Sequence, residues 1–376
     1  MRKTTLRRTA LFLIAALCLA VSAFASGEPA GSAVLWQDAV VAARERDAFG
    51  PEGGPASLSA VNTYIVTVGS GSAARAEGSA SVRLTDTCAD TAGDAVVLAG
   101  SCGAALKNAY VNAGGSALRI TGESGGTVTA EDSLFRTAGP CIRIEDAGVT
   151  LTLERCHVFF DGTAAPDPAL AEAYGADLSD PIFAGTAAAE AEEPSSLILQ
   201  LRRGPTALPG DSAAPAVVTF TGCELEGDIL NTCAAIAARP ARALVLTLRQ
   251  TTLTGAVSLG RDAWIAPAPP VGGPTEFRFA AGTTLGPWTD GADSLSLTLE
   301  DAQWTVTEDC WLTRLTLDDA SEIHGVMTVD GAETPIEPGT YEGDIVLSPA
   351  RSLISTADVS GEIYVNLDDL RDALGL

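Results

Sequence analysis

A recurring triplet, in which a threonine usually lies between two apolar residues, most constrains how this chain can fold. Apolar and polar residues that alternate with a period of two are typical of β-strands with one buried face. Recurrence of such a segment is typical of the stacked coils of a solenoid. The irregular spacing argues against leucine-rich or ankyrin repeats and favours a β-solenoid, whose loops leave the coil at its corners. The six copies are Val128-Thr129-Ala130, Leu151-Thr152-Leu153, Val218-Thr219-Phe220, Leu246-Thr247-Leu248, Leu297-Thr298-Leu299 and Leu315-Thr316-Leu317.

The residues after each triplet follow a second pattern. Two mostly polar residues form a corner and are followed by a small residue, namely Ser133, Cys156, Cys223, Thr251, Ala302 or Ala320. An apolar residue comes two positions later, except in the last copy, which has Glu322. Leu199-Gln200-Leu201 is predicted to be a degenerate intermediate copy. If successive coils stack, Thr152, Thr247, Thr298 and Thr316 must lie in one column.

The remaining segments give the expected organisation. We expect an all-β, right-handed parallel β-helix over residues 61–350, with loop excursions near 161–195 and 264–293. Residues 26–60 are expected to be a linker and cap, with a short helix over Asp38–Asp47 and Asp38 as its N-cap. Residues 351–376 are expected to be a C-terminal cap, with a short helix at Leu367–Leu374.

The first 25 residues have the features of a secretory signal peptide. Four basic residues precede an apolar run over Ala10–Phe24, and Ala23-Phe24-Ala25 provides a small-x-small cleavage site. The apolar run is too short for a lasting membrane span. We therefore expect cleavage near Ala25, a secreted or cell-surface location, and no membrane span in the mature chain.

The charge of the chain limits its partners. Its formal net charge is −25 at pH 7, so phosphate backbones and anionic membrane surfaces repel it. This charge excludes nucleic acid as the expected partner and favours an extracellular glycan or protein.

Cysteine and histidine provide few options for catalysis. Cys156 and Cys223 occupy the small-residue position, which predicts buried thiols that pack as small hydrophobic groups. Cys88–Cys102 and Cys223–Cys233 remain possible disulfides. His157 follows Cys156, but adjacent strand residues point to opposite faces, which argues against a catalytic dyad. His324 is the only other histidine.

Stacked acidic corners are the best candidate for a metal site. Glu300-Asp301 and Asp318-Asp319 occupy the same repeat position in neighbouring coils, about 4.8 Å apart if the strands stack. Stacked carboxylates repel each other unless they are solvated or bridged by a cation. The sequence thus leaves two alternatives at these residues, a calcium ion or plain solvated turns. No other cofactor is required.

The tryptophans divide into core and surface candidates. Trp304 occupies the recurring apolar position, which predicts core packing rather than sugar stacking. Trp264 and Trp288 lie in the proline-rich excursion, where exposure is expected, so they are the predicted ligand-contacting aromatic residues.

The segment Leu297–Leu317, with Trp304-Thr305-Val306 and Trp311-Leu312-Thr313, resembles the parallel β-helix of bacterial adhesin-like and pectate-lyase-like proteins. The resemblance implies a three-faced parallel sheet with a filled interior, displayed outside a bacterial cell. The polysaccharide-cleaving members carry Asn-Thr-Asp, Gly-His-Gly or Arg-Ile-Lys strings, which are absent here. The nearest string is Ile323-His324-Gly325.

Three functions remain open from the sequence. The first is an exported, non-enzymatic, adhesin-like surface or matrix protein that presents a rigid acidic β-helix to a glycan or protein. The second is a polysaccharide lyase or glycoside hydrolase on the same scaffold, although no catalytic residue is identified. The third is a structural spacer without a ligand.

Overall fold

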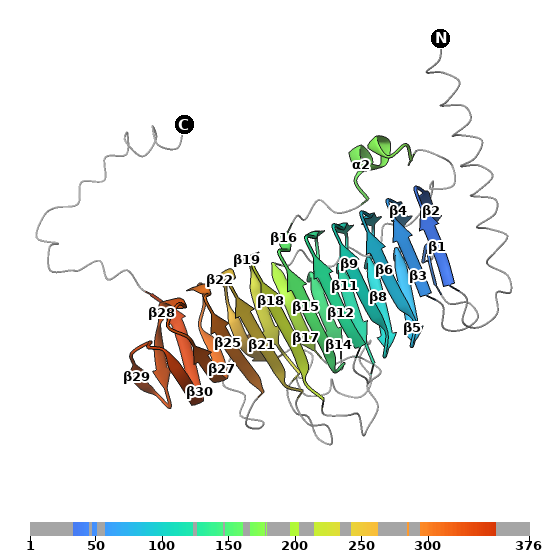
Figure 1. Ribbon diagram of the computed structural model, residues 1–376. Helices are drawn as coiled ribbons and strands as arrows, with labels where there is room; N and C mark the ends of the chain where they lie inside the picture. The colour runs from blue at the N-terminus through green and yellow to red at the C-terminus, as the bar shows by residue number, and fades with distance from the viewer. Residues whose placement is uncertain are drawn as a thin grey trace, which may run out of the picture.

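The chain folds into a parallel β-helix, as the recurring triplet predicts. The computed structural model describes residues 33–44, 47–50, 57–122, 126–145, 147–160, 166–176, 178, 196–202, 214–233, 242–261, 284–285 and 294–350. Figure 1 shows strands stacked along one axis in the order of the chain, from blue at the N-terminal end to red at the C-terminal end. The expected signal peptide and the expected helix at Leu367–Leu374 lie outside the described residues.

Three parallel ladders of strands, named sheets A, B and C, form the sides of the solenoid, and successive strands of the chain alternate between them. Sheet A contains β1 (Ala33–Gln37), β3 (Ser57–Val61), β6 (Ser81–Thr85), β9 (Gly103–Lys107), β12 (Gly126–Glu131), β15 (Val149–Glu154), β18 (Ala216–Thr221), β21 (Leu244–Arg249), β25 (Leu295–Glu300) and β27 (Cys310–Leu317). Sheet B contains β2 (Val40–Arg44), β4 (Tyr64–Val68), β7 (Cys88–Thr91), β10 (Tyr110–Ala113), β13 (Leu134–Thr137), β16 (His157–Phe160), β19 (Glu224–Glu226), β22 (Thr252–Gly255), β26 (Gln303–Val306) and β28 (Glu322–Val329). Sheet C contains β5 (Ala74–Gly78), β8 (Val96–Gly100), β11 (Leu118–Thr121), β14 (Ile142–Glu145), β17 (Leu197–Arg202), β20 (Asp228–Asn231) and β23 (Val257–Arg261).

Four further elements complete the described fold. The helix α2 (Pro168–Ala173) lies within the first expected excursion, and β24 (Thr284–Leu285) pairs antiparallel with β23. At the C-terminal end, β29 (Ala332–Thr334) pairs with β28, and β30 (Gly339–Pro349) pairs antiparallel with both β27 and β28. Because β30 pairs with β27 and β28, the last strands of the parallel stack have no open edge with which another chain could pair.

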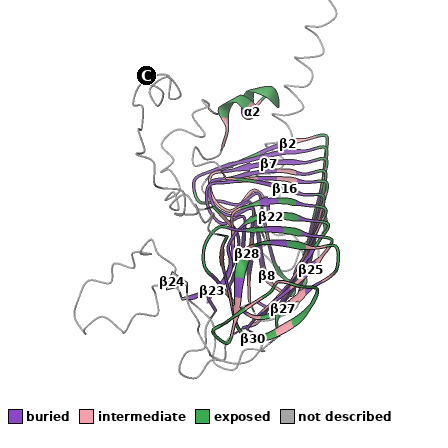
Figure 2. Ribbon diagram, turned by 90° about the vertical axis from the view of Figure 1, so that its left-hand side faces the viewer, coloured by how far each residue is buried: buried purple, intermediate pink, exposed green. Residues whose placement is uncertain are grey.

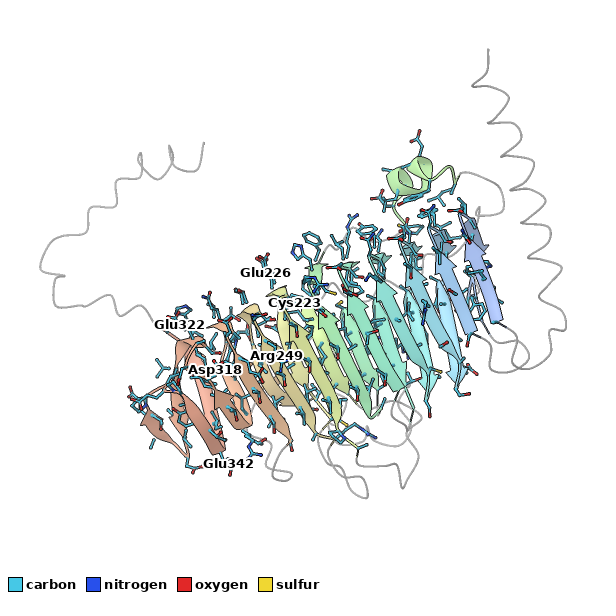
Figure 3. All side chains as sticks on the ribbon, viewed as in Figure 1. Cys223, Glu226, Arg249, Asp318, Glu322 and Glu342 are labelled. Atoms are coloured by element: carbon cyan, nitrogen blue, oxygen red, sulfur yellow. The ribbon has the colours of Figure 1, made fainter. Side chains whose placement is uncertain are left out.

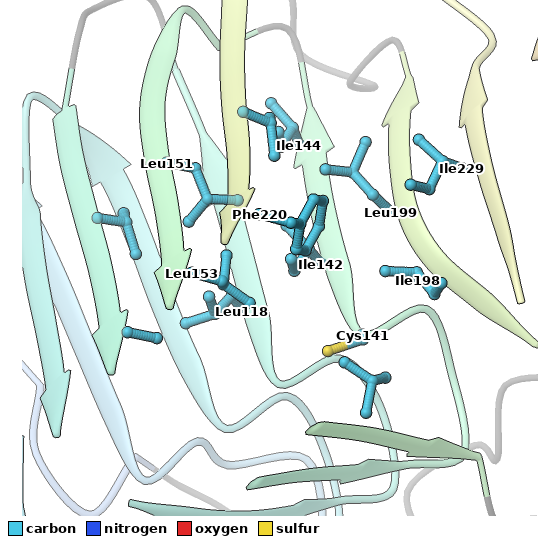
Figure 4. Close-up of a cluster of buried hydrophobic side chains, with 14 of the residues drawn as sticks. Leu118, Cys141, Ile142, Ile144, Leu151, Leu153, Ile198, Leu199, Phe220 and Ile229 are labelled. Carbon is cyan, nitrogen blue, oxygen red and sulfur yellow. The ribbon is translucent and has the colours of Figure 1, made fainter. Parts of the chain in front are cut away.

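The interior is a continuous apolar core. Figure 4 shows Leu151 and Leu153 of sheet A on one side and Ile142 and Leu199 of sheet C on the other, and all four are fully buried. Alternate residues of each strand face this core because side chains in a strand point to opposite faces in turn. Figure 2 shows the resulting alternation of buried and exposed positions along the strands.

The predicted threonine column is confirmed. Thr129 is in register with Thr152, Thr152 with Thr219, and Thr219 with Thr247. Thr298 and Thr316 continue the column. These threonines lie on the outer face of sheet A, because the apolar residues on either side of each are buried.

The corner between sheets A and B has a specific backbone requirement. Its first residue has a positive φ in nine coils, at Asp38, Asn62, Asp86, Asn108, Asp132, Arg155, Gly222, Gln250 and Asp301. Aspartate and asparagine tolerate this region better than most side chains do. Their side chains also bond between coils, as Asn62 donates to Asp38 (2.6 Å) and Asn108 donates to Asp86 (2.7 Å).

The small residue that follows this corner also bonds to the backbone. The Thr251 hydroxyl donates to the carbonyl oxygen of Arg249 at 2.9 Å, and the Cys156 thiol contacts that of Glu154 at 3.5 Å. Threonine, serine and cysteine are therefore suited to this position by hydrogen bonding as well as by size. In the last copy the corner holds one extra residue, so Ile323, not Glu322, pairs with Trp304.

Two other sequence expectations are wrong. The expected helix over Asp38–Asp47 is replaced by β2, which pairs in register with β4, and Asp38 is a positive-φ corner residue, not an N-cap. Leu199-Gln200-Leu201 lies in β17 of sheet C, not in the column of triplets on sheet A. Alternation alone identifies a strand but not the face of the solenoid to which it belongs.

Candidate binding face

The outer face of sheet B carries aromatic, acidic, amide and hydroxyl side chains. Val158, Leu253 and Trp304, each on a different strand of this sheet, point inward and are buried. The residues directly before and after each of them on its own strand therefore point outward. The helix α2 lies near the β2 and β7 end of this sheet (Figure 2). The face therefore has a covered part near its N-terminal end and an open part from β16 onward.

The covered part is a small apolar cluster outside the main core. Tyr64, Val66 and Cys88 of sheet B pack with Ala171 of α2, and all four are buried. The ring of Tyr174, which follows α2, stacks on that of Tyr64, with centroids 4.6 Å apart and an interplanar angle of 5°. This contact covers apolar side chains that would otherwise face water.

A buried carboxylate holds the α2 segment in place. Asp90 accepts hydrogen bonds from the Tyr64 hydroxyl (2.8 Å), from the Asn112 side-chain amide (2.8 Å), and from the backbone N–H of Asp167 (3.1 and 3.0 Å). Burial raises the pKa of Asp90, while these hydrogen bonds act in the opposite direction. Asp167 is also the N-cap of α2, and its carboxylate pairs with Arg136 at 3.2 Å.

The open part begins with two aromatic rings. His157 and Phe159 both lie on the outer face of β16, and their ring centroids are 4.1 Å apart. Phe159 is 42% exposed, which is unusual for a large apolar side chain. The exposed strip that continues from this pair consists of Glu224, Glu226, Thr252, Thr254, Gln303, Thr305, Glu322 and His324. Figure 3 shows Glu226 and Glu322 projecting from the same side of the stack.

The strip is acidic but contains both histidines of the chain. His157 is in register with Glu224 of the next strand, and His324 lies 3.8 Å from the carboxylate of Glu322. Four strand steps separate β16 from β28, so the two histidines lie about 19 Å apart. They are too far apart to share a metal ion.

The thiols do not form a nucleophile on this face. All seven cysteines of the described residues are buried and none is in a disulfide, so neither Cys88–Cys102 nor Cys223–Cys233 is bridged. Burial raises the pKa of Cys156 to about 12, whereas a reactive thiol needs a lowered pKa. His157 is exposed on the other side of the strand, which confirms the sequence argument against a dyad.

The predicted ligand residues have different outcomes. Trp264 and Trp288 lie outside the described residues. Trp304 is fully buried and donates to the carbonyl oxygen of Gly255 at 2.9 Å, which confirms its predicted place in the core.

Two of the candidate calcium residues, Asp318 and Glu300, already have hydrogen-bonded carboxylates. Asp318 accepts from the Ser321 hydroxyl (2.6 Å) and from the backbone N–H of Asp301 (3.2 and 3.1 Å), and the Ser321 bond contributes most to lowering the pKa of Asp318. Glu300 accepts from Arg249 at 2.6 Å. In the part of the chain that the structure describes, no group of three or more His, Cys, Asp or Glu residues is placed to hold a metal ion. Calcium binding by Glu300, Asp301, Asp318 and Asp319 remains a prediction.

Calcium titration tests that prediction. If the corner binds calcium, a millimolar excess should raise the melting temperature by about 2 °C or more, because a ligand of the folded state stabilises it. Asp318→Asn should abolish the shift. An unchanged melting temperature would contradict calcium binding and would mean that these carboxylates belong to plain solvated turns.

Two parts of this face were not recognised in the sequence. Phe159 could have been found, because the inward position of Val158 places both neighbours on the outside. Asp90 carried no such signal, because its partner Asp167 lies 77 residues away along the chain. That contact exists only after the excursion folds back onto β7.

Comparisons with known proteins do not assign this face. No protein-family model matches the sequence, and searches of curated proteins and of solved structures find no match. Among the described residues, no helix is long and apolar enough to cross a membrane.

Proposed function

We propose that the chain is an exported, non-enzymatic, adhesin-like surface protein, and that the open part of sheet B binds an extracellular glycan. The observation that carries the proposal is the exposed His157–Phe159 pair at one end of a strip of exposed polar side chains. An aromatic ring offers a flat apolar surface to the C–H groups of a sugar. The threonine, glutamine and glutamate side chains beside it provide hydrogen-bonding partners for sugar hydroxyls.

The charge and rigidity of the face narrow the class of ligand. Glu224, Glu226 and Glu322 make the strip acidic, so a neutral or amino-substituted glycan suits it better than a uronic acid polymer or a sulfated one. The strip lies on strands fixed by pairing with neighbours on both sides, so its side chains lose little freedom on binding.

Glu224 and Glu226 favour one alternative, a glycoside hydrolase. They lie two residues apart on one face of β19, so both carboxylates project from the same side, as the two carboxylates of a glycosidase must. Both side chains are exposed, however, whereas a catalytic acid is typically held in a partly buried, apolar environment. Binding without cleavage is therefore the better supported function.

A glycan array tests the proposal. The full chain should bind at least one class of neutral or amino-substituted glycan, and Phe159→Ala should weaken that binding about tenfold or more through loss of the aromatic contact. Glu77→Ala, an exposed position on β5 of sheet C, is the control and should leave binding unchanged. Equal binding by Phe159→Ala would refute the assigned face, and release of shorter sugars would support the hydrolase.

A further inference from the structure

The outer face of sheet A has a regular central column of mostly short side chains. Its central column consists of Ser59, Arg83, Ala105, Thr129, Thr152, Thr219, Thr247, Thr298 and Thr316, in register across nine strands. Thr340 of β30 extends the column, with its hydroxyl 3.2 Å from that of Thr316. Each of these side chains is half-buried or exposed, so the described array is open to a partner.

A charged column runs beside the threonines, at the edge of the sheet nearest the A–B corner. On six consecutive strands it carries Lys107, Glu131, Glu154, Thr221, Arg249 and Glu300. The signs are therefore plus, minus, minus, neutral, plus and minus. Lys107 pairs with Glu131 at 3.1 Å, and Arg249 pairs with Glu300 at 2.6 Å.

We propose that this face docks against the same face of a second copy, about a two-fold axis that is parallel to the strands and passes between β15 and β18. This symmetry sets the column against its own reverse order. Lys107 then faces Glu300, Glu131 faces Arg249, and Glu154 faces Thr221, each twice. Opposite charges meet and no like charges do, which favours association in this register.

Neighbouring registers lack this complementarity. Moving the axis onto β15 places Glu154 against its own copy and Lys107 against Arg249. Moving it onto β18 places Glu131 against Glu300. Within the corner, Arg155 already pairs with Glu131 and Glu154, so Glu154 keeps a cation when it faces the uncharged Thr221.

The threonine column suits close packing in the same register. Thr129 faces Thr247 and Thr152 faces Thr219, so short β-branched side chains meet across the centre of the interface. Sheets packed face to face lie about 10 Å apart. A second copy has the same strand spacing as the first, so its contacts stay in step over the whole face.

The available area is sufficient for a stable dimer. Eight strands from β6 to β27, at about 4.8 Å each and about 18 Å long, give roughly 700 Å² per copy. The total of about 1,400 Å² lies in the range of specific protein interfaces. The open part of sheet B stays exposed on both copies, so this inference does not depend on the proposed function.

Cysteine cross-linking tests the register. Thr129→Cys and Thr247→Cys in one chain should give a covalent dimer with a short bis-maleimide, because each new thiol faces the other across the axis between sheets about 10 Å apart. Within one chain these positions are three strands apart, about 14 Å, and their side chains point the same way, so the same short linker does not join them. Each single variant is a matched control and should stay uncross-linked. Equal cross-linking of the single variants would overturn the register.

Sedimentation velocity on the full chain tests the dimer itself. The wild-type chain should sediment as a dimer at micromolar concentration. Arg249→Glu should raise the dimer dissociation constant about tenfold or more, because it places two carboxylates together at two symmetric contacts. Glu226→Lys, a charge reversal on sheet B, is the control and should leave it unchanged. A wild-type chain that stays monomeric at about 100 μM would overturn the proposal.

Discussion

Replacing Trp304 by alanine is expected to lower the free energy of unfolding by about 3 to 5 kcal/mol. Trp304 is among the largest fully buried side chains, and its removal leaves a cavity that the rigid strands around it cannot close. The change also leaves the carbonyl oxygen of Gly255 without its indole donor. Urea unfolding followed by far-UV circular dichroism measures the loss.

Trp304→Phe separates the two contributions. It keeps most of the buried apolar surface and loses the hydrogen bond, so we expect a smaller cost of about 1 to 3 kcal/mol. The exposed Thr305, on the same strand, provides the surface control, since Thr305→Ala should change stability by no more than about 0.5 kcal/mol. A Trp304→Ala variant as stable as the wild-type chain would contradict the packing described for sheet B.

Replacing Asp90 by alanine is expected to release α2 from sheet B and to cost about 2 to 5 kcal/mol. The change deprives three donors of their acceptor, namely the Tyr64 hydroxyl, the Asn112 amide and the backbone N–H of Asp167. Cys88 reports the release because it is buried under α2 and burial raises its pKa to about 12. Its thiol should become reactive toward Ellman's reagent in Asp90→Ala, and Cys88→Ala in the same background should abolish that signal.

Asp90→Asn is the matched control, and it isolates the charge. One amide oxygen can accept from Asn112 and Asp167, while the amide nitrogen can donate to the Tyr64 oxygen, so α2 should stay docked. Burial raises the pKa of Asp90. A pKa above the unfolded value means that this group's contribution to stability is present at low pH and is lost as pH rises through the folded pKa. Relative to Asp90→Asn, the wild-type chain should therefore lose stability as pH rises from about 4. The opposite slope would contradict the assigned role of burial.

Much of the solenoid follows from local pattern. Alternation around Thr152 and Thr298 predicts strands with one buried face, and recurrence of the triplet predicts that they stack in one column. The same alternation places Cys156 inside and His157 outside. These predictions succeed because a strand offers only two faces, so the position of one apolar residue fixes that of its neighbours.

Other features depend on contacts that no short pattern contains. The segment Val40–Arg44 carries enough alanine and arginine to suit a helix, yet it pairs with β4 because strand pairing outweighs weak local propensity. Leu199 and Leu201 show the alternation of sheet A but lie in sheet C, since the length of the preceding excursion decides which face the chain rejoins.

The sequence by itself determined the class of fold, the inward and outward alternation of the strands, and the burial of Trp304 and Cys156. Only the tertiary structure decided that Asp90 would anchor α2, and that Phe159, Glu224 and Gln303 would share one open strip. The physical reason is that alternation is a property of neighbouring residues. The composition of a solenoid face instead depends on which coil lies next to which, and loops of unequal length hide that order in the sequence.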